Sequence, residues 1–191
     1  MFDHMNRRLL AELTFESAIG TILDDARAPN GAEFGNLQIC VSDRLLIVDQ
    51  HGFTRPFLDT FREVTPHEST ACGRALKSGK TVLVEDVELD EEFAPYRSLA
   101  RTAGFRSVVT TPLLTSGGHI IGAVSTHFAR VHQPTALEIA AFEQYCLGAS
   151  NYLWDLLGER TLAAVAREMN GRLYDTHAVR GAPIGETPAP C

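Results

Sequence analysis

Residues 71–87 read ACGRALKSGKTVLVEDV, and this stretch decides how the chain folds. A helix of small residues that carries Cys72 stops at Gly79, and a strand, Thr81–Glu85, follows at once and runs into an acidic loop. Glycine directly after a helix is a common stop signal, and a run of Val and Leu bounded by turn residues is typical of a strand. The stretch therefore predicts a short helix that leads directly into a strand.

The residues that follow predict one more helix and a hairpin. Glu91–Thr102 has a helical pattern with Asp90 as its cap. Ser107–Leu114 and His119–Phe128 are apolar enough for two strands, and Ser116-Gly117-Gly118 has the composition of a hairpin turn. We therefore expect two paired strands beside the strand of the opening stretch.

The residues that precede the stretch predict a long helix, a first hairpin and a short helix. Apolar residues recur with helical period over residues 7–28. Leu37–Val41 and Leu45–Val48 suit two strands, with Asp43-Arg44 as the turn between them. A short helix is expected to start near Pro56.

The last long helix is expected from Pro134 to about Met169. The whole order predicts an α+β fold: one antiparallel sheet, with the terminal helices on one face and short helices over a ligand pocket on the other. We divide the chain into an N-terminal helix (1–30), a domain (31–157), a helical extension (158–177) and a disordered tail (178–191).

Composition excludes several classes of function. The chain has 191 residues, a formal net charge of −7 and 45% hydrophobic residues, and its Lys and Arg form no stripe that would indicate nucleic-acid binding. No apolar run approaches the ~20 residues of a membrane span, and the N-terminus lacks the apolar core of a secretory signal. We expect a cytoplasmic protein with reduced cysteines.

Three segments carry a resemblance to a known family. Gly35-Asn36-Leu37-Gln38, Ala71–Leu76 and Thr111-Pro112-Leu113-Leu114, in this order, resemble GAF (PAS-like) domains of bacterial sensor histidine kinases. The resemblance covers about Gly35–Leu157. It implies a non-enzymatic sensory or regulatory module of bacterial signal transduction, with a small-molecule ligand and a possible signalling partner. It leaves the ligand and any cofactor unknown.

The resemblance also places the expected ligand pocket. The segments that face it carry aromatic residues, a thiol and a few polar groups, which pack either as plain core or as an apolar cavity with polar contacts. The expected pocket residues are Phe53, Phe57, Phe61, Cys72, Asp86, Phe93, Tyr96, Phe105, Ser107, Thr110 and Thr126.

A redox enzyme that uses Cys72 is a less favoured reading. GAF-fold methionine sulfoxide reductases carry a Cys-Gly pair at a matching place, and they also need cysteines after the third strand. That segment, Glu88–Arg106, holds none here, and bilin-binding relatives would need an attachment cysteine in it too. The signature of cyclic-nucleotide-binding relatives is also missing. We expect Cys72 to be a packed thiol.

Two groups of residues could suggest a metal. Asp90, Glu91 and Glu92 lack the spacing of a calcium loop and are expected in the first turn of a helix, where acids are favoured. His67 and His127 belong to no metal-binding motif, and a hydrogen-bonded structural role is favoured for His127. No metal site is expected.

A second hypothesis makes the protein a ligand-free dimerisation or scaffold module. The last helix is longer than one small domain needs, so its apolar face could pair with a second copy. The expected interface of this homodimer comprises Phe142, Ala149, Leu153 and Leu156.

Overall fold

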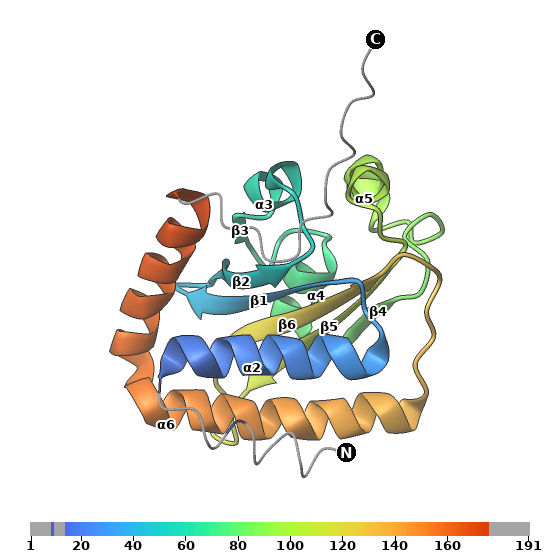
Figure 1. Ribbon diagram of the computed structural model, residues 1–191. Helices are drawn as coiled ribbons and strands as arrows, with labels where there is room; N and C mark the ends of the chain where they lie inside the picture. The colour runs from blue at the N-terminus through green and yellow to red at the C-terminus, as the bar shows by residue number, and fades with distance from the viewer. Residues whose placement is uncertain (1–8, 10–13, 176–191) are drawn as a thin grey trace, which may run out of the picture.

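The computed structural model describes residue 9 and residues 14–175, and it shows one antiparallel sheet between two layers of helices (Figure 1). The sheet has six strands in the order β3-β2-β1-β6-β5-β4. Its strands are β1 (Phe34–Val41), β2 (Arg44–His51), β3 (Glu63–Val64), β4 (Val82–Val84), β5 (Ser107–Leu114) and β6 (Ile120–Phe128). The helices are α2 (Phe15–Arg27), η1 (Ala28–Asn30), α3 (Arg55–Thr60), α4 (Ala71–Ser78), η2 (Ala94–Tyr96), α5 (Arg97–Ala103) and α6 (Ala136–Asp175).

The two faces of the sheet bury two separate cores. Successive residues of a strand point to opposite faces, so Leu37 and Ile39 of β1 pack with α2 and the first half of α6. Ile47 of β2 and Val108 of β5 belong to the second core, beneath the short helices. In Figure 1, α2 and the first half of α6 lie side by side on one face. The expected α+β fold with terminal helices on one face is therefore confirmed.

The helix that the opening stretch predicts is α4, and its ends have clear causes. Thr70 caps it by accepting a hydrogen bond from the backbone N–H of Gly73, and Gly79 ends it in the left-handed conformation. Gly73 is also a point of close approach, because an added Cβ would lie 2.4 Å from the carbonyl oxygen of Glu68. The small residues of α4 thus let it pack closely on its surroundings.

Several boundaries differ from the sequence-based expectation. The first hairpin turns at Ser42 and Asp43, one residue earlier than predicted, because both residues adopt positive φ angles of 50° and 66°, which suits a tight two-residue turn. The two-residue strand β3 was not predicted. Most of residues 7–13 and all of 178–191 lie outside the described residues.

The predicted helix Glu91–Thr102 is wrong in its first half. The carboxylate of Asp90 accepts a hydrogen bond from the backbone N–H of Phe93 and forms a local turn. Pro95 lies in the single turn η2, and α5 begins only at Arg97. The acidic residues Asp90, Glu91 and Glu92 therefore belong to a loop, and not to the first turn of a helix.

Helix α6 bends sharply at Gly158. This glycine has φ 66° and ψ 165°, which no helix allows, so two helices meet at an angle there. The second half then climbs along the β2 side of the sheet (Figure 1). Asn170 Nδ2 donates to the Ile47 carbonyl oxygen of β2, and Tyr174 Oη donates to the Leu58 carbonyl oxygen of α3. The extra length of α6 thus packs within its own chain.

No helix in the described part of the chain combines the length and apolar character that crossing a bilayer would require.

Candidate functional site

A small cavity lies between the sheet and the short helices. Its volume is about 20 Å³, which is enough for about one water molecule. The residues that line it are Asn36, Gln38, Phe57, Phe61, Thr70, Ala71, Cys72, Phe93, Phe105, Val108 and His127. It therefore occupies the place that the sequence analysis gave to the ligand pocket.

Aromatic rings from four segments enclose this cavity. Phe53 and Phe57 stack with ring centroids 3.6 Å apart, and Phe105 meets Phe57 edge-on at 6.0 Å. The rings of Phe93 and Phe105 also meet edge-on, with centroids 6.2 Å apart. Phe57 is on α3 and Phe93 precedes η2, so two of the walls come from short elements outside the sheet. A shift of those elements would change the volume of the cavity.

The floor of the cavity is polar, because β1 and β6 place polar side chains on this face of the sheet. Asn36 and Gln38 alternate along β1, and His127 comes from the adjacent strand β6. Their exposed fractions are only 2%, 1% and 4%. Within the described chain, Asn36 Oδ1, Gln38 Oε1 and His127 Nδ1 have no hydrogen-bond partner.

Such a cluster is unusual in a folded protein. More than 90% of buried polar groups find a partner, and each one left without costs roughly 1–3 kcal/mol. Here three of them line the same cavity. Gln50, opposite Asn36 on β2, uses its Oε1 to accept from the backbone N–H of Phe53, while its buried Nε2 lacks a partner among the described residues. The floor therefore offers hydrogen-bonding atoms that the described residues leave without partners.

His127 is neutral at physiological pH. Burial lowers the pKa of its imidazole to about 3, and the rings of Phe53, Phe57 and Phe105 meet it edge-on at centroid distances of 4.7–5.8 Å. The hydrogen-bonded structural role expected for this residue does not hold for Nδ1, which has no partner within residues 14–175. His67, the other histidine considered, is exposed and does not line the cavity.

Cys72 lies at the start of α4, with its sulfur against two hydroxyls of the sheet. Its Sγ is 3.3 Å from Ser125 Oγ and 4.0 Å from Thr110 Oγ1, and these two oxygens are 2.8 Å apart. Burial raises the pKa of the Cys72 thiol, so the neutral thiol dominates at neutral pH. This environment is that of a packed thiol, and not of an activated nucleophile.

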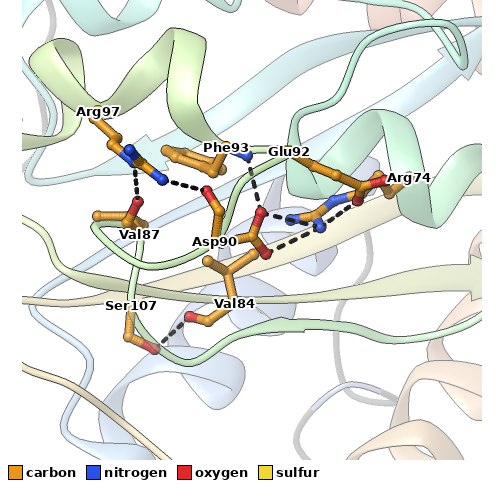
Figure 2. Close-up of polar contacts among 8 residues, drawn as sticks. All are labelled: Arg74, Val84, Val87, Asp90, Glu92, Phe93, Arg97 and Ser107. Carbon is orange, nitrogen blue, oxygen red and sulfur yellow. Dashed lines mark hydrogen bonds and ion pairs between the residues drawn. The ribbon is translucent and has the colours of Figure 1, made fainter.

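The loop that covers the cavity, residues 85–96, is held by arginines from two neighbouring helices (Figure 2). Arg74 of α4 reaches it through Nη1, which lies 3.1 Å from Asp90 Oδ2 and 2.7 Å from Glu92 Oε2. Arg97 of α5 donates to the backbone carbonyl oxygens of Val87 and Asp90. We call this segment the covering loop.

Two further ion pairs fix the start of the covering loop. Arg106 makes a bidentate contact with Asp86, at 3.0 and 2.8 Å, and its hydrogen bonds lower the pKa of that carboxyl group. Arg101 pairs with Glu88 in the same way and lowers the pKa of Glu88. Four acids of the covering loop, Asp86, Glu88, Asp90 and Glu92, thus pair with arginines.

The structure brings most of the expected pocket residues together. Phe57, Phe61, Cys72, Phe93 and Phe105 line the cavity. The other rings and the threonine lie next to it: Phe53 stacks on Phe57, Tyr96 contacts the rings of Phe61 and Phe93, and Thr110 lies beside Cys72.

Three expected pocket residues lie elsewhere. Asp86 is engaged with Arg106, and Ser107 donates its hydroxyl to the Val84 carbonyl oxygen (Figure 2). Thr126 points to the opposite face of the sheet, where it lines a separate cavity of about 160 Å³ beside α6. The reason is the strand alternation, because His127 and Ser125 take the pocket face of β6 and leave Thr126 on the other.

The expected dimer interface also needs correction. Ala149 and Leu153 have no exposed surface, because they pack in the core of their own chain with α2 and the sheet. Phe142 is partly buried against the same core, and Leu156 keeps 37% exposure. Two of the four residues are therefore not accessible to a second copy.

The sequence analysis did not identify Asn36 and Gln38 as site residues. The available signal was two amides alternating with Leu37 and Ile39 in a strand whose other residues are apolar. On a strand covered on both faces, such polar residues have to meet either a partner or a cavity.

Comparisons with known proteins agree with this arrangement. The profile of the GAF domain family matches residues 17–152. Among curated protein sequences, no match was found.

Solved structures similar to this chain include three of different kinds. A free methionine-R-sulfoxide reductase from Neisseria meningitidis, in complex with its substrate, is 16% identical over 81% of this chain and 86% of its own, with a TM-score of 0.65. A domain described as that of a two-component sensor histidine kinase from Sinorhizobium meliloti is 17% identical, covering 82% and 99%, with a TM-score of 0.59. The GAF domain of a phosphoenolpyruvate-protein phosphotransferase from Coxiella burnetii is 14% identical, covering 89% and 94%, with a TM-score of 0.64.

These identities establish a shared fold and no shared ligand. Because the family profile covers well over half of the sequence, and the sheet and helices follow the same plan, the chain belongs to the GAF domain family.

Proposed function

We propose that this GAF domain is a non-enzymatic sensory or regulatory module that binds a small molecule in the cavity between the sheet and the short helices. The observation that carries the proposal is the cluster of unpartnered polar atoms, among the described residues, on the floor of an aromatic cavity. The sensor-kinase domain of similar fold supports a role in bacterial signal transduction, which we propose to take place in the cytoplasm. A signalling protein would then be the downstream partner.

The proposal requires the cavity to open. At about 20 Å³ it holds roughly one water, so a ligand has to displace part of the wall. The covering loop carries Phe93 and is fixed by side-chain contacts with Arg74 and Arg97. A ligand that favours the displaced loop would shift the population toward it.

Helix α6 offers a route by which such a change reaches the opposite face. Tyr174 near its end donates to the Leu58 carbonyl oxygen of α3, and Arg55 of α3 donates to the Tyr174 carbonyl oxygen at 2.7 Å. Helix α3 also carries Phe57, which lines the cavity. The first half of α6 packs on the other face, with α2.

Native mass spectrometry of the protein purified from its own host tests the proposal. We expect a mass excess that disappears on denaturation and that is lost in Gln38→Leu. Thr126→Val, on the opposite face of the sheet, is the matched control and should retain the excess. A bare mass, together with no response to a broad metabolite library, would contradict the proposal.

The proposal excludes redox turnover by Cys72. The related reductase acts on free methionine-R-sulfoxide, and Cys72 here is a neutral thiol in contact with two hydroxyls. We expect no reduction of that substrate by the wild-type protein. Turnover that disappears in Cys72→Ser would overturn this part of the proposal.

A homodimer through the terminal helices is a second proposal, and Leu137 favours it. This residue of α6 is 80% exposed, and Leu156 on the same helix is 37% exposed. A two-fold contact over the first half of α6 would cover both. Sedimentation at high micromolar concentration should show a dimer that Leu137→Ser weakens, and a clean wild-type monomer would reject it.

A further inference from the structure

The three side chains of the cavity floor that have unpartnered atoms among the described residues each combine a donor with an acceptor. Asn36 and Gln38 contribute side-chain amides, each of which presents an N–H donor beside a carbonyl acceptor. His127 contributes a neutral imidazole, which has one donor and one acceptor nitrogen. The natural complement of an amide edge is another edge with a donor beside an acceptor.

The cavity offers no charge to a ligand. None of the described residues that line it is an Arg, Lys, Asp or Glu. Asp90 and Glu92 of the covering loop pair with Arg74 of α4, which lies outside the lining of the cavity. A charged ligand would lose its water and find no counter-charge, which costs several kcal/mol.

Two side chains that line the cavity are themselves disfavoured in their charged forms. Burial lowers the pKa of His127, which disfavours the cationic imidazolium. Burial also raises the pKa of Cys72, which disfavours the anionic thiolate, although its Sγ lies near two hydroxyls. The same site thus disfavours both signs of charge.

The walls add a preference for shape. Phe57 and Phe105 meet edge-on with ring centroids 6.0 Å apart, and both line the cavity, so a flat aromatic body can extend this set of ring contacts. The polar floor lies on one side only, along β1 and β6. A ligand would therefore place a polar edge on the strands and a flat body among the rings.

We infer that the ligand of this cavity is a small, flat, uncharged molecule with an amide-like edge, such as a primary amide, a lactam or a ureide. This inference rests on the proposed function and narrows it to one chemical class. Gln38 and Asn36 are the residues that would recognise the polar edge.

Isosteric probes of different charge test this inference directly. The benzamide, benzoate and benzamidinium set and the smaller acetamide, acetate and acetamidinium set keep shape constant within each set while the charge changes. Binding would be followed by shifts of protein amide NMR signals at pH 7. We expect the neutral amide of at least one set to bind at least tenfold more tightly than both charged members. Gln38→Leu should weaken that binding at least fivefold, and Thr126→Val should not.

The outcomes separate this inference from the proposed function. Equal or tighter binding of a charged probe would overturn the neutral class and leave the small-molecule sensor standing. If no probe binds, the molecule retained by the host-purified protein decides: an uncharged amide-like molecule supports the inference and a charged one overturns it. The absence of any retained molecule as well would overturn both.

Discussion

At the scale of residues, the proposed binding site depends on two amides of β1. Asn36 and Gln38 are buried almost completely, and one oxygen of each has no partner within the described residues. A structural amide would instead have its hydrogen bonds made by the chain. Stability measurements can therefore tell a binding residue from a structural one here.

We predict that Gln38→Leu stabilises the ligand-free protein. Leu has a similar volume and removes the unpartnered oxygen, so the gain is expected to be about 1 kcal/mol, within the roughly 1–3 kcal/mol that such a group costs. For a chain of this size, that raises the melting temperature by about 2–4 °C. Calorimetry of both proteins after refolding from denaturant checks this. A loss of stability would mean that Gln38 has a structural partner.

His127 predicts how stability depends on pH. The unfolded histidine takes up a proton below about pH 6.5, whereas the folded one does so only near pH 3. The unfolded state therefore binds more protons in this window, and stability falls as the pH falls through it. From pH 7 to pH 5 this one group removes roughly 2 kcal/mol.

His127→Phe should remove that part of the pH dependence. Urea unfolding at pH 7 and pH 5 measures the difference in free energy of unfolding for each protein. We expect the wild type to lose roughly 2 kcal/mol more than the variant between the two pH values. An equal loss in both would show that His127 is not buried as a neutral group. His67→Phe, at an exposed position, is the control.

At the scale of elements, a single side chain of α4 makes both ion pairs in the middle of the covering loop. Arg74 is only 20% exposed, and its Nη1 contacts both Asp90 and Glu92. Removing one partner of a partly buried pair costs more than removing an exposed pair. The loop should therefore open more often when Arg74 is replaced.

Arg74→Met is predicted to speed hydrogen exchange in residues 86–94, because local opening needs less free energy once the ion pairs are lost. Exchange in β1 and β6 should change much less. Arg44→Met removes an exposed ion pair with Glu63 and serves as the control. We expect it to change the free energy of unfolding by less than about 1 kcal/mol. Uniform acceleration over the whole domain would instead indicate global destabilisation.

Two glycines of α6 make opposite predictions. Gly158 has a backbone conformation that is essentially reserved for glycine, so Gly158→Ala should cost about 1–3 kcal/mol. Gly171 lies in the regular second half with open space around it, so Gly171→Ala should stabilise by up to about 1 kcal/mol. Chemical denaturation of both variants checks the pair. Similar effects would mean that the bend is not fixed at Gly158.

Local patterns predicted these elements to different degrees. Gly79 marks the end of α4 by cap chemistry that depends on adjacent residues, so the sequence alone indicates it. The first half of the predicted helix Glu91–Thr102 failed because Asp90 formed a turn and Arg74 engaged it from a distant helix. The sequence could not show that second contact, since 16 residues separate the partners.

At the scale of the whole molecule, the same limit explains the site. Phe57, Phe61, Phe93 and Phe105 line the cavity as expected, because the resemblance to the family orders the segments that surround it, whereas Phe53 and Tyr96 lie next to it. Thr126 was placed on the wrong face of the sheet, because neighbouring residues of a strand point to opposite faces and an error of one residue changes the face. The sequence analysis assigned the extra length of the last helix to contact with a second copy. The bend at Gly158 instead brings the second half of α6 against β2 and α3 of the same chain.

The bend also sets where the chain can be cut. The second half of α6 packs against β2, where Asn170 donates a hydrogen bond to the Ile47 carbonyl oxygen. The strand β3 pairs with only two residues of β2. A fragment trimmed to residues 1–157 would uncover much of the outer edge of β2, the edge that does not pair with β1, and uncovered strand edges pair with other chains.

We therefore predict that the 1–157 fragment aggregates at concentrations where the chain extended to residue 177 stays dispersed. Light scattering of the two proteins, made side by side, measures this. A dispersed, well-folded short fragment would show that the second half of α6 is dispensable. If the prediction holds, the smallest stable fragment is longer than the part of the chain that matches the family profile, which ends at residue 152.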